Sequence, residues 1–92
     1  MIKTFKHKAL SEFFATGKTA KIDQKMLSRI KVRLDRLEQA TTVGEMKLPG
    51  FDFHPLNGFN PTKYTVHVNG PWCITFEFDN GDAYNVDFEQ YH

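Results

Sequence analysis

The second half of the chain alternates between apolar and polar residues, a pattern that predicts β-strands with one buried face. The alternation runs through four segments bounded by turn residues, at about 51–54, 64–69, 72–78 and 84–89. Asn80-Gly81 joins the last two segments and predicts a tight type I′ hairpin. We therefore expect four antiparallel strands in succession. Their predicted buried face carries Tyr64, Val66, Val68, Trp72, Ile74, Phe76, Tyr84, Val86 and Phe88.

The first half has helical periodicity instead. Leu10, Phe13 and Phe14 recur at helical spacing before Gly17, which predicts a helix over about 8–16. A second apolar stripe steps by three, four and three residues and predicts a helix over about 23–40, with Asp23 as its N-cap. That stripe consists of Leu27, Ile30, Leu34 and Leu37. Residues 2–6 alternate weakly and are consistent with a short edge strand.

Helices followed by hairpins indicate an α+β fold. We expect two N-terminal helices packed on one face of an antiparallel sheet of about four to five strands, in one domain over residues 1–92. The opposite face of the sheet is predicted to be polar and open. It would carry Thr65, His67, Cys73, Thr75, Glu77, Asn85, Asp87 and Glu89.

Composition narrows the functional class. The chain has 92 residues, 40% of them hydrophobic and 25% charged, which is typical of a globular domain. It has no apolar run of the roughly 18 residues that a membrane span needs, and its basic N-terminus lacks the apolar segment of a signal peptide. The single cysteine, Cys73, excludes an internal disulfide and any multi-cysteine zinc site. We therefore expect a cytoplasmic protein with no cofactor, although four histidines leave a metal site open.

Charge is distributed unevenly along the chain. Residues 1–50 hold eleven Lys and Arg against five Asp and Glu, a net +6, whereas residues 51–92 hold one against six, a net −5. A basic first half fits RNA or an acidic protein as partner. The candidate RNA-binding residues lie on the second helix and in the loop before it: Lys18, Lys21, Lys25, Arg29, Arg33 and Arg36. The same pattern is also typical of a solvated helix face.

Histidine and tyrosine residues offer the candidate chemistry. His54 lies at a strand end beside Pro55, and Tyr91 and His92 end the chain. An imidazole can take or give a proton near neutral pH, and a phenol can donate a hydrogen bond to a phosphate oxygen. Such a set is suited to RNA cleavage without a metal, although a lone histidine at a strand end is more often a surface residue.

Five short motifs together carry a family resemblance. They are the opening ten residues from Met1 to Leu10, His54-Pro55-Leu56-Asn57-Gly58, the Trp72–Phe78 strand, Asn80-Gly81-Asp82-Ala83-Tyr84, and the final Tyr91-His92. In this order they resemble a HigB-type killer toxin, a branch of the RelE/ParE toxin–antitoxin superfamily. The resemblance implies a RelE-like fold and a metal-independent endoribonuclease that cleaves mRNA in the ribosomal A site. It also implies growth arrest and neutralisation by a HigA-type helix-turn-helix antitoxin.

The resemblance makes His54, Tyr91 and His92 the catalytic residues, and three neighbouring positions depart from the family pattern. Asn57 stands where the pattern has Lys, Cys73 where it has Arg, and Gln90 where it has Asp. Lys and Arg would hold the scissile phosphate, so without them we expect the positive charge to come mainly from a protonated histidine. We expect Cys73 to be a small residue at an Arg position and not a nucleophile.

Two alternatives stay open from the sequence. One is a protein that keeps the RelE fold and antitoxin binding but has weak or lost cleavage, because the phosphate-holding residues are missing. The other is a ParE-like poison of DNA gyrase.

Overall fold

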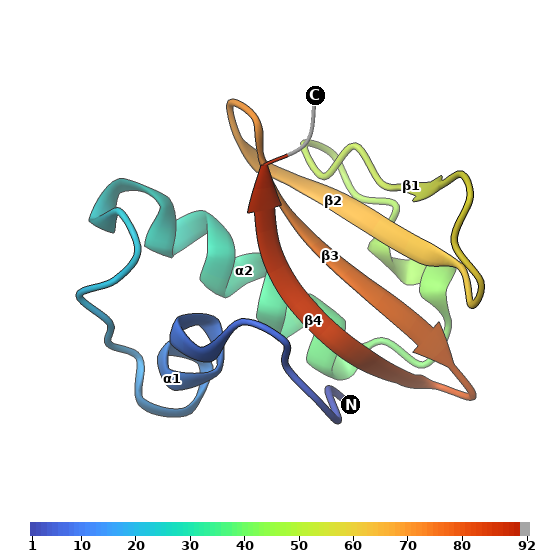
Figure 1. The fold of residues 1–92 in the computed structure, drawn as a ribbon, viewed down its shortest axis with the longest axis horizontal. Helices are drawn as coiled ribbons and strands as arrows, with labels where there is room; N and C mark the ends of the chain where they lie inside the picture. The colour runs from blue at the N-terminus through green and yellow to red at the C-terminus, as the bar shows by residue number, and fades with distance from the viewer. Residues whose placement is uncertain (91–92) are drawn as a thin grey trace.

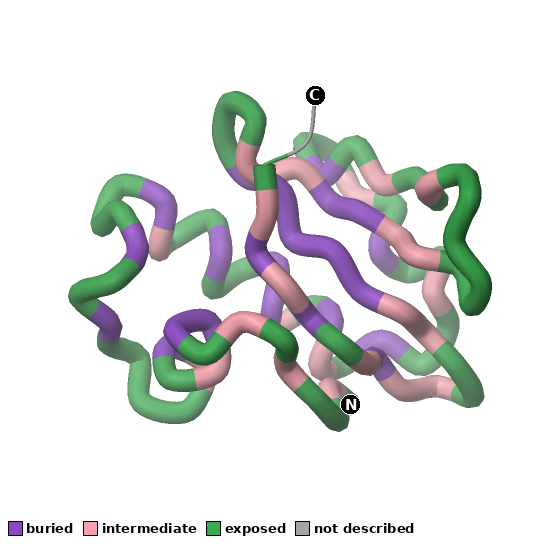
Figure 2. The backbone as a smooth tube through the Cα atoms, viewed as in Figure 1, coloured by how far each residue is buried: buried purple, intermediate pink, exposed green. Residues whose placement is uncertain are grey.

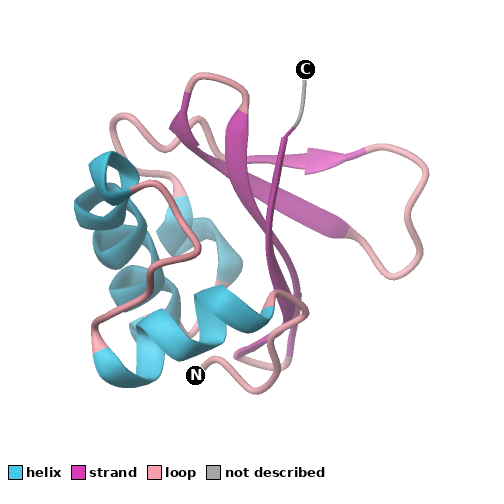
Figure 3. Cartoon of the chain, turned by 60° about the vertical axis from the view of Figure 1, so that its left-hand side comes forward, coloured by secondary structure: helices cyan, strands magenta, loops and turns pink. Residues whose placement is uncertain are grey.

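The computed structural model describes residues 1–90, in which two α-helices lie on one side of an antiparallel sheet (Figures 1 and 3). The sheet has the order β1-β2-β3-β4, and each strand pairs antiparallel with the next. The elements are α1 (Lys8–Thr16), the 3-10 turn η1 (Gln24–Met26), α2 (Leu27–Gln39), the 3-10 turn η2 (Val43–Met46), β1 (His54–Leu56), β2 (Lys63–Asn69), β3 (Trp72–Asp79) and β4 (Asp82–Gln90). The α+β prediction is confirmed. Within residues 1–90, no helix combines the length and the apolar character needed to cross a bilayer.

Both helices form close to where the sequence predicts them. α1 ends at Gly17, whose φ of 77° gives the left-handed conformation of a C-cap. The predicted second helix is divided in two: Asp23 caps η1 by accepting a hydrogen bond from the Lys25 backbone N–H at 3.0 Å, and α2 begins at Leu27. The apolar stripe of α2 faces the sheet, with Ile30, Leu34 and Leu37 at most 1% exposed.

The core fills the space between α2 and the sheet. Figure 2 shows the middle parts of the two central strands buried and their ends more exposed. The fully buried side chains that the sheet contributes to the core are Val66, Val68, Ile74, Phe76 and Val86. Both helices lie on this side, and no helix of residues 1–90 covers the opposite face of the sheet (Figure 3). We call that face the open face. Its centre is less open than predicted, because Thr65, Cys73 and Thr75 are buried.

A β-bulge in β4 corrects the predicted burial of one aromatic residue. Thr75 pairs with Asp87 but Glu77 pairs with Tyr84, so β4 has one more residue than β3 over this stretch. Asn85 absorbs the extra residue with a φ of 52°. The bulge shifts Tyr84 onto the open face opposite Glu77. Tyr84 was predicted on the buried face, and Ala83 lies there instead, fully buried.

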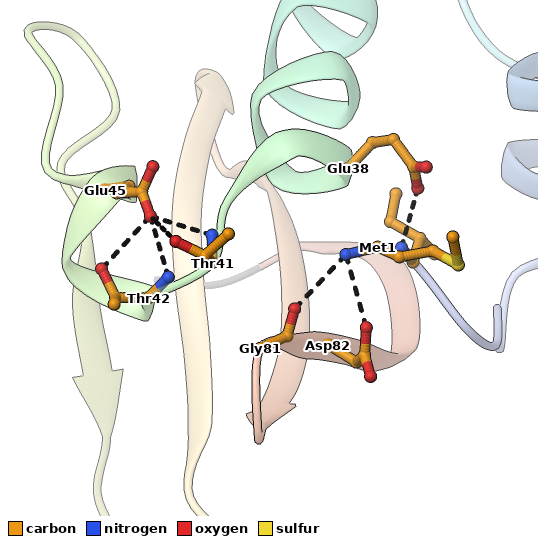
Figure 4. A network of polar contacts seen from close by, with 8 residues as sticks. Met1, Glu38, Thr41, Thr42, Glu45, Gly81 and Asp82 are labelled. Atoms are coloured by element: carbon orange, nitrogen blue, oxygen red, sulfur yellow. Dashed lines mark hydrogen bonds and ion pairs between the residues drawn. The ribbon is translucent and has the colours of Figure 1, made fainter.

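The N-terminal segment extends the sheet beyond β4. Ile2 and Phe5 form isolated parallel bridges with Ala83 and Val86, so the predicted edge strand over residues 2–6 is present only as two bridges. The Met1 ammonium group lies 3.5 Å from the Asp82 carboxylate (Figure 4). The Ile2 N–H donates a hydrogen bond to the Glu38 carboxylate at 2.8 Å. These contacts join the N-terminus to the β3–β4 hairpin and to the last turns of α2.

The edge strand β1 begins later than predicted. Alternation predicted a strand at about 51–54, with Pro55 either ending it or marking it as an edge strand. β1 runs instead from His54 to Leu56 and includes Pro55. Asp52, with a φ of 45°, turns the chain before the strand starts. Proline is tolerated here because β1 is an edge strand with pairing on one side.

Glu45 organises the turn that follows α2. One carboxylate oxygen accepts hydrogen bonds from the backbone N–H groups of Thr42 and Thr41, each at 2.8 Å, and from the Thr41 hydroxyl at 2.9 Å (Figure 4). These hydrogen bonds, first of all those from the backbone, lower the pKa of Glu45 from 4.5 to about 2.

Leu34→Ala tests the packing of α2 on the sheet. Leu34 is 1% exposed, so the change removes buried apolar surface and leaves a cavity. We expect the free energy of unfolding to fall by about 2–5 kcal/mol in urea denaturation. Val32→Ala, on the exposed side of the same helix, should change it by about 0.5 kcal/mol or less. Equal losses in both variants would contradict the assigned packing.

Glu45→Gln tests the turn after α2 through its pH dependence. Because the folded pKa of Glu45 lies below its ordinary value, ionised Glu45 stabilises the fold fully above about pH 4.5. That stabilisation is lost as the pH falls towards 2. We expect the difference in Tm between parent and Glu45→Gln to shrink over this interval in thermal scans. A difference that stays constant from pH 7 to pH 2 would show that the charge of Glu45 is not involved.

Candidate active site

A hollow of about 260 Å³ lies on the open face where β1, β2 and the β2–β3 turn meet. Its lining contains both histidines of the strands and the single cysteine. The lining residues are Asp52, His54, Leu56, Thr65, His67, Gly70 and Cys73.

Strand register brings these side chains together. His54 on β1 pairs with Thr65 on β2, and two residues further along β2 His67 pairs with Cys73 on β3. Neighbouring strands lie about 4.8 Å apart, and residues two positions apart on a strand share a face. Side chains from one face of β1, β2 and β3 therefore surround the hollow, although these residues are far apart in sequence.

The hydrogen bond of His54 defines its tautomer. Its Nδ1 lies 2.8 Å from the Asp52 carbonyl oxygen. A carbonyl can only accept, so Nδ1 carries the hydrogen and donates it. In the neutral ring Nε2 is then the nitrogen with the lone pair. The left-handed turn at Asp52, which directs that carbonyl, thus prepares His54 to accept a proton at Nε2.

His67 is a second histidine of the hollow, which the sequence did not mark as a site residue. Its Nε2 lies 3.0 Å from the Gly70 carbonyl oxygen, so by the same argument Nε2 donates and the lone pair of the neutral ring is on Nδ1. Alternation along β2 had placed His67 on the polar face. Its proximity to His54 depends on the β1–β2 register, which no local pattern reveals.

Arg33 corrects the prediction of a fully exposed basic helix face. It was predicted to contact RNA, but it is only 8% exposed. Its Nε donates to the His67 carbonyl oxygen, its Nη1 donates to that of Arg29 at 3.1 Å, and its Nη2 donates to that of Gly50 at 3.2 Å. The guanidinium carbon lies 4.5 Å from the centre of the Phe51 ring. Burial, and secondly the charge of Arg29, lower the pKa of Arg33.

The Arg33 guanidinium group binds β2 at His67 and the loop at Gly50, and the His67 backbone N–H donates to the Phe51 carbonyl at 2.6 Å. The loop carrying Asp52 and His54 is thereby attached to the strand carrying His67. Arg33 therefore holds the residues around the hollow in place, and its guanidinium group faces backbone oxygens and not the solvent.

Beside the hollow, one lysine and one glutamate of the open face form an ion pair. The Nζ of Lys63 lies 2.9 Å from the Oε2 of Glu89. The Thr75 hydroxyl donates a hydrogen bond to the same carboxylate oxygen. Partial burial raises the pKa of Glu89, but the hydrogen bonds from Thr75 and Lys63 and the charges of Lys63 and Lys6 outweigh it and leave the pKa lowered. Glu89 is therefore ionised at neutral pH, and its pairing with Lys63 offsets the positive charge that Lys63 brings to this face.

The remaining predicted site residues have different positions. Cys73 lines the hollow, as its place on the polar face predicted. Asn57 is exposed in the loop after β1 and does not line it. Gln90 is the last described residue, paired with Trp72, which precedes Cys73. Tyr91 and His92 lie outside the described residues.

Five of the six predicted RNA-binding residues are exposed. They are Lys18, Lys21, Lys25, Arg29 and Arg36, which we call the basic set. Arg29 donates to the Val68 carbonyl at 3.2 Å and to the Asn69 side chain at 3.3 Å, at the turn that borders the hollow. The basic set therefore begins next to the open-face hollow.

Among residues 1–90, no three His, Cys, Asp or Glu side chains gather in a way that could hold a metal ion. The thiol of Cys73 lies 3.8 Å from the Pro71 carbonyl oxygen. The hollow therefore offers imidazole chemistry: one ring that can accept a proton at Nε2 and another that can accept one at Nδ1.

Comparison with known proteins identifies related sequences over nearly the whole chain. Residues 3–92 match the HigB-like toxin family, described as the RelE-like toxin of the type II toxin–antitoxin system HigB. The chain is also 40% identical over 92 residues to Endoribonuclease HigB of Proteus vulgaris, and the alignment covers the whole of both chains.

Arg33→Met tests the hydrogen bonds by which the buried guanidinium group links β2 to the loop before β1. The change keeps most of the side-chain volume but leaves the carbonyl oxygens of His67 and Gly50 without a donor. We expect the free energy of unfolding to fall by about 1–3 kcal/mol for each acceptor that stays unpaired. Arg36→Met is the matched control on the exposed face and should change stability by about 0.5 kcal/mol or less. Unchanged stability of Arg33→Met in urea denaturation would show that these hydrogen bonds do not stabilise the fold.

Proposed function

The chain belongs to the HigB-like family of RelE-type toxins of type II toxin–antitoxin systems, and we propose that it is an endoribonuclease that cleaves mRNA on the ribosome. The observation that carries the proposal is the imidazole of His54 in the open-face hollow, held by Asp52 with Nε2 as its proton acceptor. The relative from Proteus vulgaris bears the name of an endoribonuclease, which supports the same reaction.

The chemistry proceeds by transesterification within the RNA. His54 Nε2 takes the proton of a 2′-hydroxyl group, and the 2′-oxygen attacks the adjacent phosphorus. The bond between phosphorus and the 5′-oxygen breaks, and the leaving oxygen receives a proton from a general acid. We assign that acid to the C-terminal pair, Tyr91 and His92. No protein nucleophile is needed, so Cys73 takes no covalent part.

The ribosome is the proposed platform for the substrate. The open face holds carboxylates at Glu77, Asp87 and Glu89, which do not favour a free phosphate backbone. The basic set lies on the α2 side of the molecule and is suited to ribosomal RNA, which would present the mRNA to the hollow. We place this activity in the cytoplasm, where ribosomes translate.

The proposed protein partner is a HigA-type helix-turn-helix antitoxin. Membership of a type II toxin–antitoxin family implies an antitoxin that binds and silences the toxin. Co-expression with the antitoxin of the same operon should restore growth to cells that this chain arrests.

His54→Ala tests the proposed base. Loss of the proton acceptor should lower the single-turnover cleavage rate of ribosome-bound mRNA by about 10²–10⁴-fold. The exposed Asp79→Asn, at the β3–β4 end of the sheet, should cleave like the parent. The parent rate should follow a bell-shaped pH profile, because a base and an acid must be in opposite protonation states. Full activity of His54→Ala would contradict the assignment, and growth arrest by the parent without RNA cleavage would favour a gyrase poison.

The double variant Lys25→Glu/Arg36→Glu tests the basic set. Each lost phosphate contact should reduce the slope of log affinity for ribosomes against log salt concentration by about one. Both residues are exposed, so Tm should stay close to that of the parent. Lys31→Glu/Lys47→Glu changes the net charge equally but lies outside the basic set. Identical salt slopes in the two double variants would mean that the basic set is only a solvated face.

A further inference from the structure

We propose that His67 is the phosphate-binding cation of the hollow, a role distinct from that of His54 as base. This inference rests on the proposed RNA cleavage. It adds a second described histidine to the reaction and assigns it to the non-bridging oxygens of the scissile phosphate.

The composition of the hollow leaves few choices for a positive charge. Neither Lys nor Arg is among the seven residues that line it. Of those described residues only His54 and His67 can become cationic. His54 must be neutral at Nε2 to accept the 2′-hydroxyl proton, so it cannot also supply the charge. The cation therefore falls to His67.

The contacts of His67 suit this role. Its Nε2–H is already donated to the Gly70 carbonyl, so the ring can gain a proton only at Nδ1. The resulting Nδ1–H is a charge-assisted donor of the kind that phosphate oxygens bind strongly. The Gly70 contact also links the ring to the β2–β3 turn. The backbone of His67 is held at both polar groups, because its carbonyl accepts from Arg33 and its N–H donates to the Phe51 carbonyl.

The groups around His67 do not replace it. On β3 His67 pairs with Cys73, which in turn pairs with Glu89 on β4. Glu89 forms an ion pair with Lys63. On the β1 side lie His54 and Asp52, the latter exposed. From α2 the Arg33 guanidinium donates to three backbone oxygens, including that of His67. Arg29 donates to the Val68 carbonyl and to the Asn69 side chain. None of these groups offers a free positive charge to the hollow.

The register with Cys73 supplies a sharp test by rescue. In His67→Gln the side-chain amide can still donate to the Gly70 carbonyl, but no positive charge can form. Cys73→Arg then places a permanent cation on the neighbouring strand, directly opposite position 67. Cleavage of ribosome-bound mRNA by the parent, His67→Gln and His67→Gln/Cys73→Arg is compared under single-turnover conditions, with Tm and ribosome affinity measured for each.

We expect His67→Gln to cleave on the order of 100-fold more slowly, the effect of removing one donor to a developing anion. Its Tm and ribosome affinity should be close to those of the parent, and the added Cys73→Arg should restore most of the rate. A merely structural role would lower Tm and would not be rescued by Arg at position 73. An active parent with a fully active His67→Gln would overturn this inference alone. A parent that cleaves no ribosome-bound mRNA would overturn the proposed function and this inference together.

Discussion

The buried guanidinium group of Arg33 is the contact on which the site depends. It reaches from α2 to carbonyl oxygens on β2 and on the loop before β1, and it stacks on Phe51. A charge in such a place is tolerated only when its donors are satisfied, and here three backbone oxygens accept from it. A buried charge without hydrogen-bond partners is costly. The fold therefore favours the arrangement of loop and strand in which the carbonyl oxygens of His67 and Gly50 accept from Arg33. That arrangement places His54 and His67 in one hollow.

The open face works with little net positive charge. The Lys63–Glu89 pair neutralises one of its lysines, and Cys73 contributes no charge where the family pattern has Arg. A small protein with such a face cannot capture RNA by electrostatic attraction at the site itself. In the proposed function, binding and chemistry are therefore separated: the exposed basic residues on the helix side would bind ribosomal RNA, and the imidazoles on the sheet would transfer protons. This separation is why we propose that the ribosome presents the substrate.

Several features could be predicted from the sequence because they depend on nearby residues. The α2 stripe, the Gly17 cap, the Asn80-Gly81 hairpin and the polar face of β2 and β3 all follow from local periodicity and turn chemistry. Errors arose where one residue broke the period. The bulge at Asn85 moved Tyr84 to the open face, and the turn at Asp52 delayed β1 until His54. An extra residue in a strand reverses the alternation on one side of it relative to the other, and the hydrophobic pattern alone does not locate that residue.

The sequence by itself determined the α+β class, the face of the sheet that no helix of residues 1–90 covers, and His54 and Cys73 as residues of that face. Only the tertiary structure decided that Arg33 is buried whereas Arg29 and Arg36 are exposed, because all three fit the same helical ridge. It also decided that His67 lies in the same hollow as His54. The reason is physical: helical and strand periods are set by neighbours in the chain, whereas burial and proximity depend on which distant backbone oxygens and strands lie opposite a side chain.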